Sequence, residues 1–211
     1  MKSLAQALGA ASIAAALLLG GVARAQEQDA SPQAMVESVV GQVMQAVRSD
    51  PAIQAGDRRQ IRALVESKIL PHADFARTTR LAMGPQWANA TPQQRAQLQT
   101  QFELLLINTY SGAISQVRDQ TVTYRGAPGS SSDDAVVRSQ MNNAGGPLEL
   151  DYRLVKTPEG WKVYDIGVMG AWLIAAYRDQ FRDVINQRGI DGLIQFLQQK
   201  NEAIANGAPA S

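Results

Sequence analysis

The sequence predicts an α+β fold, with helices before and after one curved, four-stranded antiparallel or mixed sheet. Three observations predict it. Apolar residues recur every three or four positions up to Val117, then at every second position from Thr121 to Val168, and again at helical spacing after Gly170. No internal repeat and no interdomain linker interrupts the chain, so we expect a single domain.

The N-terminus has the features of a secretory signal peptide. An apolar run follows Lys2, and Ala23-Arg24-Ala25 has the small-x-small pattern of a cleavage site. The run is too short and too rich in alanine for a stable membrane span. The last residues of the chain are small and polar, which is typical of disorder. We predict a cleaved signal peptide at 1–25, a single domain at 26–200 and a disordered tail at 201–211.

The composition excludes several classes of protein. The chain has 211 residues, a formal net charge of +1 and no cysteine. Without a basic patch, no interaction with nucleic acid is predicted. Without cysteine, neither a disulfide framework nor a thiolate metal site is possible. Secretion without cysteine is consistent with a bacterial periplasm.

The helices before the sheet are predicted from apolar stripes and capping residues. A first helix spans 36–47. The strongest local signal is Thr91 as N-cap, with Pro92 at the first helical position and Gln94 at the third. A long helix follows, to Val117, and its apolar stripe predicts that it lies across the sheet.

The strands are predicted from alternating apolar and polar residues. They cover 121–125, 135–141, 148–156 and 161–168. One face of the third strand carries Leu148, Leu150, Tyr152 and Leu154. The sequence from Thr157 to Gly160 has proline and glycine where a type I turn favours them, so the last two strands should form an antiparallel hairpin.

The stretch 161–181 runs from the fourth strand into a helix through a turn of small residues at Gly167 and Gly170. Its strand end and helix start are apolar and carry almost no reactive side chain. The helix should end near Gly189, with a last helix at 191–200. We therefore interpret this stretch as the wall of an apolar pocket.

Side chains arranged for catalysis are missing from the sequence. His72 is the only histidine, and there is no G-x-S-x-G motif, P-loop or dinucleotide fingerprint. Asp133-Asp134 in a serine-rich loop is more typical of a solvated turn than of a metal site. We predict no catalytic residue, no metal and no cofactor.

Two alternatives stay open at this point. Asp165, on a strand that faces an apolar cavity, could act as the general base of an isomerase-type enzyme with a tyrosine as its acid. The tyrosines considered are Tyr110, Tyr152 and Tyr177. The other interpretation of Asp165 is a structural hydrogen bond at a sheet edge or to a helix terminus. Alternatively, the protein is a periplasmic interaction module whose apolar residues are merely core.

The order and spacing of five segments resemble the MlaC family, also called the toluene-tolerance auxiliary family. The segments are 69–75 (ILPHADF), 81–87, the Thr91-Pro92-x-x-Arg95 helix start, Gly160-Trp161-x-Val163-Tyr164-Asp165, and 189–193 (GIDGL). The resemblance extends from about Val36 to Lys200.

The resemblance implies a nuclear-transport-factor-2-like fold whose sheet and helices enclose an apolar cavity. It also implies a periplasmic phospholipid carrier with bound phospholipid as cargo. Such carriers shuttle lipid between an outer-membrane lipoprotein complex and an inner-membrane ABC transporter with a substrate-binding ring, which maintains outer-membrane lipid asymmetry. We expect a monomer.

Apolar side chains on the predicted inner faces are our candidates for lipid contact. They are Phe102, Leu106, Tyr110, Ile114, Leu148, Leu150, Tyr152, Leu154, Ile166, Val168, Met169, Ala171, Ile174, Ala175 and Tyr177. Relatives usually carry Glu-Gly where this chain has Met169-Gly170, and a flexible thioether there could fill irregular space in the cavity.

Overall fold

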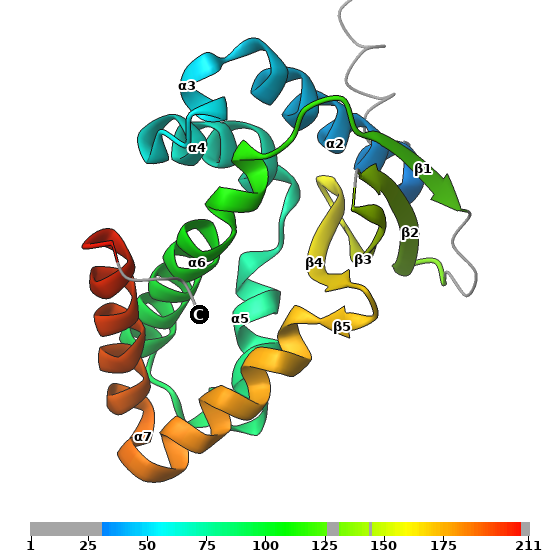
Figure 1. Cartoon of the computed structure of the whole chain (residues 1–211). Coiled ribbons are helices and arrows are strands. Elements are labelled where there is room, and N and C mark those ends of the chain that lie inside the picture. Colours follow the sequence, from blue (N-terminus) through cyan, green and yellow to red (C-terminus); the bar gives the residue numbers. More distant parts are fainter. Residues whose placement is uncertain (1–30, 126–130, 144, 208–211) are drawn as a thin grey trace, which may run out of the picture.

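The computed structural model describes residues 31–125, 131–143 and 145–207. The predicted signal peptide and the last four residues of the predicted tail, 208–211, lie outside these ranges. Figure 1 shows two parts side by side: a sheet with helix α2 against it, and a group of helices that includes α5, α6 and α7. We call the second part the helical group.

The strands form one antiparallel sheet in chain order. They are β1 Thr121–Arg125, β2 Asp134–Asn143, β3 Gly146–Thr157, β4 Gly160–Val168 and β5 Ala171–Trp172. The α+β prediction is confirmed, with five strands instead of four. The fifth strand forms because Met169 and Gly170, with φ of 50° and 82°, make the two-residue turn that favours a hairpin.

Within the described residues, the α-helices before the sheet begin at side-chain caps, whereas the short π- and 3-10-helical segments between them, labelled η, have none. They are α2 Pro32–Ser49, α3 Pro51–Gln54, α4 Arg58–Leu64, η1 Val65–Ile69, η2 Leu70–His72, α5 Phe75–Met83, η3 Gly84–Asn89 and α6 Pro92–Ser115. At α6, the Thr91 hydroxyl accepts from the Gln94 N–H and the Gln94 side chain accepts from the Thr91 N–H, so the predicted capping signal is confirmed. Such caps satisfy N–H groups that the helix leaves unpaired, which fixes where the helix begins.

Helix α6 packs mainly on α7, α5 and α4, so the prediction that it lies across the sheet is wrong. The reason is that its apolar stripe meets aromatic side chains of α7; the rings of Phe102 and Phe181 have centroids 5.0 Å apart. The helix that covers the sheet is α2, whose Val36 belongs to the same buried cluster as Val137 on β2.

Helix α7 spans Leu173–Ala205 and is broken at Gly189, where φ is 70°. The predicted helix end at this glycine is confirmed. The last part of α7 continues past the predicted boundary at 201, because Asn201 and Ile204 are buried against the rest of the molecule.

The turn before α7 differs from the predicted one. Ala171 and Trp172 form β5 instead of opening the helix, and Gly167 lies within β4 instead of in the turn. A Cβ on Gly167 would sit 3.2 Å from the Trp172 ring. A side chain here would force the ring to shift by a few tenths of an ångström, so glycine is favoured at this position by the close approach of the ring and not by a turn.

The buried apolar side chains form three clusters. One joins α5, α6 and α7, one joins α2 to the sheet, and one joins the end of α2 to α3, α4 and η1. Apolar contacts in a domain of this size usually make one contiguous core. Among the described residues, the buried apolar side chains of the helical group and of the sheet therefore belong to separate clusters.

A buried carboxylate joins the two parts instead. The Asp165 side chain on β4 has no exposed surface. Its Oδ1 accepts from the Ile174 N–H in the first turn of α7 at 3.1 Å, and its Oδ2 accepts from Arg153 Nη1 at 3.2 Å. The Arg153 guanidinium also lies 3.9 Å from the Trp172 ring centroid. The structural interpretation of Asp165, as a partner of a helix terminus, is confirmed.

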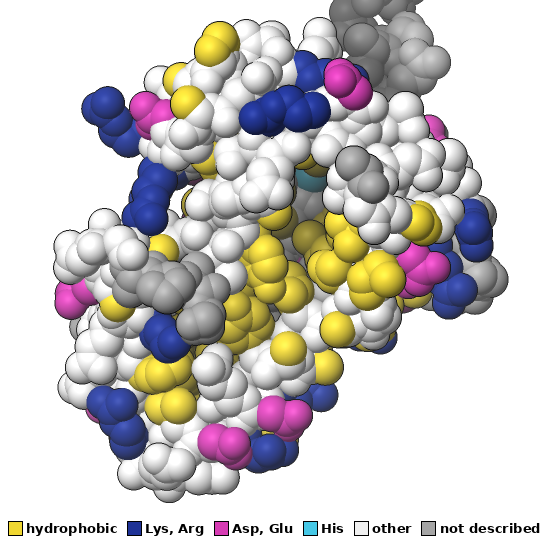
Figure 2. All heavy atoms as spheres, viewed as in Figure 1, with side chains coloured by type: hydrophobic (Ala, Val, Ile, Leu, Met, Phe, Trp, Pro, Cys, Tyr) yellow, Lys and Arg dark blue, Asp and Glu magenta, His cyan; other side chains and the backbone are white. Residues whose placement is uncertain are grey.

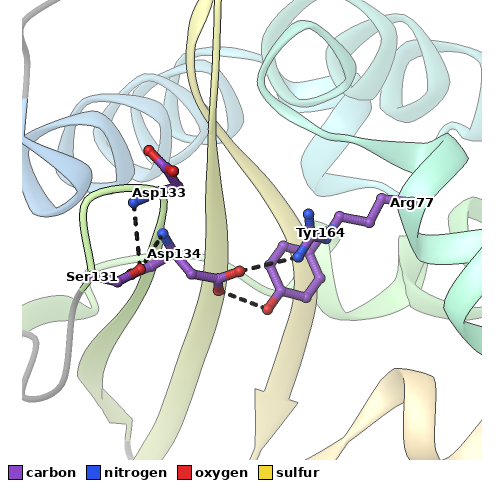
Figure 3. A network of polar contacts seen from close by, with 5 residues as sticks. All are labelled: Arg77, Ser131, Asp133, Asp134 and Tyr164. Atoms are coloured by element: carbon purple, nitrogen blue, oxygen red, sulfur yellow. Dashed lines mark hydrogen bonds and ion pairs between the residues drawn. The ribbon is translucent and has the colours of Figure 1, made fainter.

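A second polar connection joins α5 to the sheet (Figure 3). Arg77 Nη2 lies 3.0 Å from Asp134 Oδ2, and the Tyr164 hydroxyl donates to Asp134 Oδ1 at 2.9 Å. The Arg77 guanidinium stands 4.3 Å from the Tyr164 ring centroid. The Ser131 Oγ accepts from the Asp134 N–H at 3.0 Å, which holds the start of β2 in place.

We expect Asp165→Ala to lower the free energy of unfolding by about 2–4 kcal/mol, because it leaves a buried N–H and the Arg153 guanidinium without their acceptor. Urea denaturation at neutral pH would measure the loss. The matched control is Asp179→Ala on the exposed face of α7, where the carboxylate pairs with Arg182 at 2.9 Å; its cost should stay below about 0.5 kcal/mol. Equal losses in the two variants would contradict the role assigned to Asp165.

Candidate functional site

Hydrophobic side chains gather inside a hollow between the helical group and the sheet (Figure 2). The hollow has α5 and α6 on one side and β4 on the other. Its position corresponds to the gap between the apolar clusters of the two parts. We call this region the apolar hollow.

The wall on the helical side is backed by aromatic rings. Phe102 is fully buried at the centre, and its ring makes edge contacts with Phe75, Tyr177 and Phe181 at centroid distances of 6.2, 4.9 and 5.0 Å. Tyr177 is only partly buried in this cluster. Edge-to-face ring pairs add stability beyond the area they bury, so the wall is rigid behind its partly exposed members.

The sheet carries one apolar face, and part of it packs under α2, where Tyr152 and Leu154 share a buried cluster with Val36. Pairing places Leu150 opposite Val168, and Tyr152 opposite Ile166. The register then shifts, so that Leu154 pairs with Val163 and Tyr164 is the extra residue of a bulge. This bulge brings Val163 and Ile166, three positions apart, onto the same face.

The predicted lipid contacts differ in how much surface they retain. Those buried in the protein alone are Phe102, Tyr152, Leu154 and Ile174. Those that are partly buried are Leu106, Ile114, Leu148, Leu150, Ile166, Val168 and Tyr177. Those that are exposed are Tyr110, Met169, Ala171 and Ala175. Only the partly buried and exposed side chains have surface to offer a ligand without rearrangement.

Two predicted residues lie apart from the others. Ile114 packs against the third cluster, with Val47 and Ile53, so α6 turns it away from Phe102. Met169 is 61% exposed at the tip of the β4–β5 turn, where its Sδ lies 3.3 Å from the Glu149 N–H. The conformation of the turn therefore sets the direction of the Met169 side chain, and packing in the hollow does not.

Sequence reasoning missed several partly buried apolar residues beside the two walls. They include Phe75 and Val184 in the helical group and Val39, Val40, Tyr124 and Val163 near the sheet. The valines of α2 could have been found, because their helical spacing was recognised. Their place against the sheet depends on which helix covers it, and that is not a local property of the sequence.

Asp165 is not placed to act as a general base. Both of its oxygens accept hydrogen bonds within the fold, and the side chain is closed to solvent. Burial raises its pKa, while the hydrogen bond from Ile174 and the charge of Arg153 act in the opposite direction. Its environment is that of a structural carboxylate.

The described residues offer no obvious place for a metal. Within 31–125, 131–143 and 145–207, no three histidine, cysteine or acidic side chains come together as a metal-binding group. None of the helices in these ranges combines the length and apolar character needed to cross a bilayer.

The sequence also matches the model of a known protein family. The family model described as MlaC protein matches residues 37–199. The chain belongs to the MlaC family. The family predicted from the five sequence segments is thus confirmed.

Two named proteins are similar to this chain. The intermembrane phospholipid transport system binding protein MlaC of Haemophilus influenzae is 20% identical over 183 residues, which cover 84% of this chain and 86% of that protein. The toluene tolerance protein ttg2D of Pseudomonas putida is 29% identical over 103 residues, 48% of each chain.

A solved structure matches almost completely. The phospholipid-binding protein from Ralstonia solanacearum, determined in complex with a phospholipid, superposes with a TM-score of 0.81. It is 47% identical, and the match covers 83% of this chain and 99% of that one. At this identity and TM-score, the two chains share a fold over the matched residues.

Tyr177 generates a prediction about pH. Burial raises its pKa to about 12, and the neighbouring Tyr110 adds to the rise. The folded protein therefore holds this proton to higher pH than the unfolded chain, whose tyrosines titrate near pH 10. The free energy of unfolding should fall as pH rises from about 10 to 12, with no effect of Tyr177 below that window.

Ultraviolet absorbance of tyrosinate during a pH titration would test this. Tyr177→Phe should remove one late-titrating phenol and reduce the fall in stability above pH 10. Tyr110→Phe is the matched control, which should keep the Tyr177 phase but move it to lower pH. An unchanged late phase in Tyr177→Phe would show that the Tyr177 hydroxyl is not shielded.

Proposed function

We propose that this protein is a periplasmic phospholipid carrier that holds acyl chains in the apolar hollow. In this proposal it shuttles lipid between an outer-membrane lipoprotein complex and an inner-membrane ABC transporter, and so maintains outer-membrane lipid asymmetry. The observation that carries the proposal is the hydrophobic hollow between two parts whose described buried side chains form separate apolar clusters. The phospholipid bound to the 47% identical R. solanacearum protein supports it.

The energetics of lipid transfer explain why such a site suffices. Each methylene buried away from water contributes roughly 0.8 kcal/mol, and a diacyl lipid has dozens of them. A free lipid therefore rarely crosses an aqueous compartment. A carrier needs an apolar lining around the acyl chains, which we call the sleeve, and few polar groups. The side chains on the two sides of the hollow have this character.

We propose that the sleeve consists of the predicted side chains that keep free surface beside the two walls. From the helices these are Leu106, Tyr110 and Tyr177, and from the sheet Leu148, Leu150, Ile166 and Val168. The fully buried Phe102 and Leu154 stand behind them as rigid support. Selectivity should then follow tail volume more than headgroup chemistry, because convergent polar groups are few.

Protein purified under mild conditions without added lipid should contain phospholipid, on the order of one molecule per chain. The reason is that an unfilled apolar hollow leaves its walls in contact with water. Solvent extraction followed by mass spectrometry measures the content. Finding no lipid, together with no uptake from vesicles of labelled phospholipid, would disprove the proposal.

Filling the hollow from α6 should displace the cargo. We expect Leu106→Trp to reduce co-purified phospholipid to about half or less, because the larger ring takes space that an acyl chain would occupy. Leu104→Trp is the matched control, since Leu104 is also partly buried on α6 but lines a different surface. Equal lipid content in the two folded variants would exclude Leu106 from the sleeve.

A further inference from the structure

A second, chemically different recess lies between α4, α6 and the end of α7. It has a volume of about 740 Å³. Its lining includes Arg58, Arg59, Arg62, Gln101, Leu104, Ile107, Asn108, Gln198, Asn201 and Glu202. We call it the arginine cleft.

The arginine cleft and the apolar hollow use opposite sides of α6. Successive residues of an α-helix are rotated by about 100°. Gln101, Leu104 and Asn108 therefore project from one side of α6, and Phe102 and Leu106 from the side roughly opposite. A ligand in the cleft does not compete with a lipid in the hollow.

The charges of the cleft are not neutralised within it. Arg58 is used by the fold, because its Nη1 donates to the Ile204 carbonyl near the end of α7 at 2.8 Å. Arg59 and Arg62 are exposed, and neither guanidinium makes a hydrogen bond or ion pair with any residue in the described ranges. Glu202 is the one acidic residue among the lining side chains. Nearby, the charges of Glu66 and Arg62 both act on the Glu103 carboxyl of α6, which forms no ion pair with a described residue.

The floor and walls are suited to a peptide. Leu104 and Ile107 give partly buried apolar surface, and the Gln198 amide makes no hydrogen bond with a described residue. The buried Asn201 is held by the Gln101 carbonyl at 2.9 Å, so the amide wall is rigid. Amides both donate and accept, as an extended peptide backbone requires.

We propose that the arginine cleft is a docking site for an acidic peptide segment of a partner protein. Arg59 and Arg62 pair with its carboxylates, and the Gln198 amide meets its backbone. A free phosphate would occupy a small part of 740 Å³. A phospholipid would find too little apolar wall for its tails. The proposal goes beyond lipid carriage and does not depend on it.

The probe is an end-blocked tetraglutamate peptide, titrated into isotope-labelled full-length protein at low salt and followed by nuclear magnetic resonance. We expect saturable shifts confined to α4, the Leu104–Asn108 side of α6 and the end of α7. Arg59→Gln combined with Arg62→Gln should weaken binding about tenfold or more, because charged hydrogen bonds are lost. Added salt should weaken it in the wild type.

The matched control combines Arg182→Gln with Arg188→Gln, which removes the same charge from the exposed face of α7 outside the cleft. This control should bind tetraglutamate like the wild type, and both double variants should keep their phospholipid content. Absence of saturable shifts at the cleft would overturn the proposal. So would equal weakening in the two double variants, or equally tight binding of inorganic phosphate at the same resonances.

Discussion

The buried carboxylate of Asp165 is the interaction on which the arrangement of this protein depends. It binds the first turn of α7 on one side and Arg153 on the other, so the helix leaves the sheet in one direction only. Trp172 packs on Gly167 and against the same arginine, which closes this corner. An apolar contact at this position would not define one orientation, whereas directional hydrogen bonds fix the angle between α7 and the sheet. That angle keeps α7, and α6 packed on it, away from the face of the sheet.

The polar contacts between the helical group and the sheet explain how the protein keeps a hydrophobic hollow open. Asp165 and the Arg77–Asp134–Tyr164 network hold the helical group at the edge of the sheet. Each part is stabilised by its own apolar cluster, so neither needs the other's inner face for stability. Apolar surface left between two such parts favours an apolar ligand. The family to which the chain belongs, and the phospholipid in its solved relative, are consistent with that preference.

Features set by local chemistry were predictable from the sequence. The capping box at Thr91, the alternating strands and the helix break at Gly189 each depend on a few neighbouring residues. Features that depend on which surfaces meet were not. The apolar stripe of α6 predicted a sheet contact because a stripe does not specify its partner. For the same reason it could not show that Ile114 packs against the cluster of Val47 and Ile53. The bulge at Tyr164 requires pairing with β3, so alternation within β4 alone could not reveal it.

The candidate site was predictable as chemistry more than as geometry. Apolar faces without catalytic groups predicted an apolar cavity. Phe102 and Leu154, however, are so well buried that they pack behind the surface of that cavity and have no free surface of their own. A side chain can contact a ligand only if it keeps free surface after both parts have packed. That depends on how the polar contacts of Asp165 and Asp134 place the two parts relative to each other. Helix α6 shows the consequence most clearly. One side faces the apolar hollow, and the other lines the cleft with Gln101, Leu104 and Asn108, across from the arginines of α4. One helix thus separates the proposed cargo site from the proposed docking site. Because the two sites share a helix but no side chain, substitutions in one should leave the other intact.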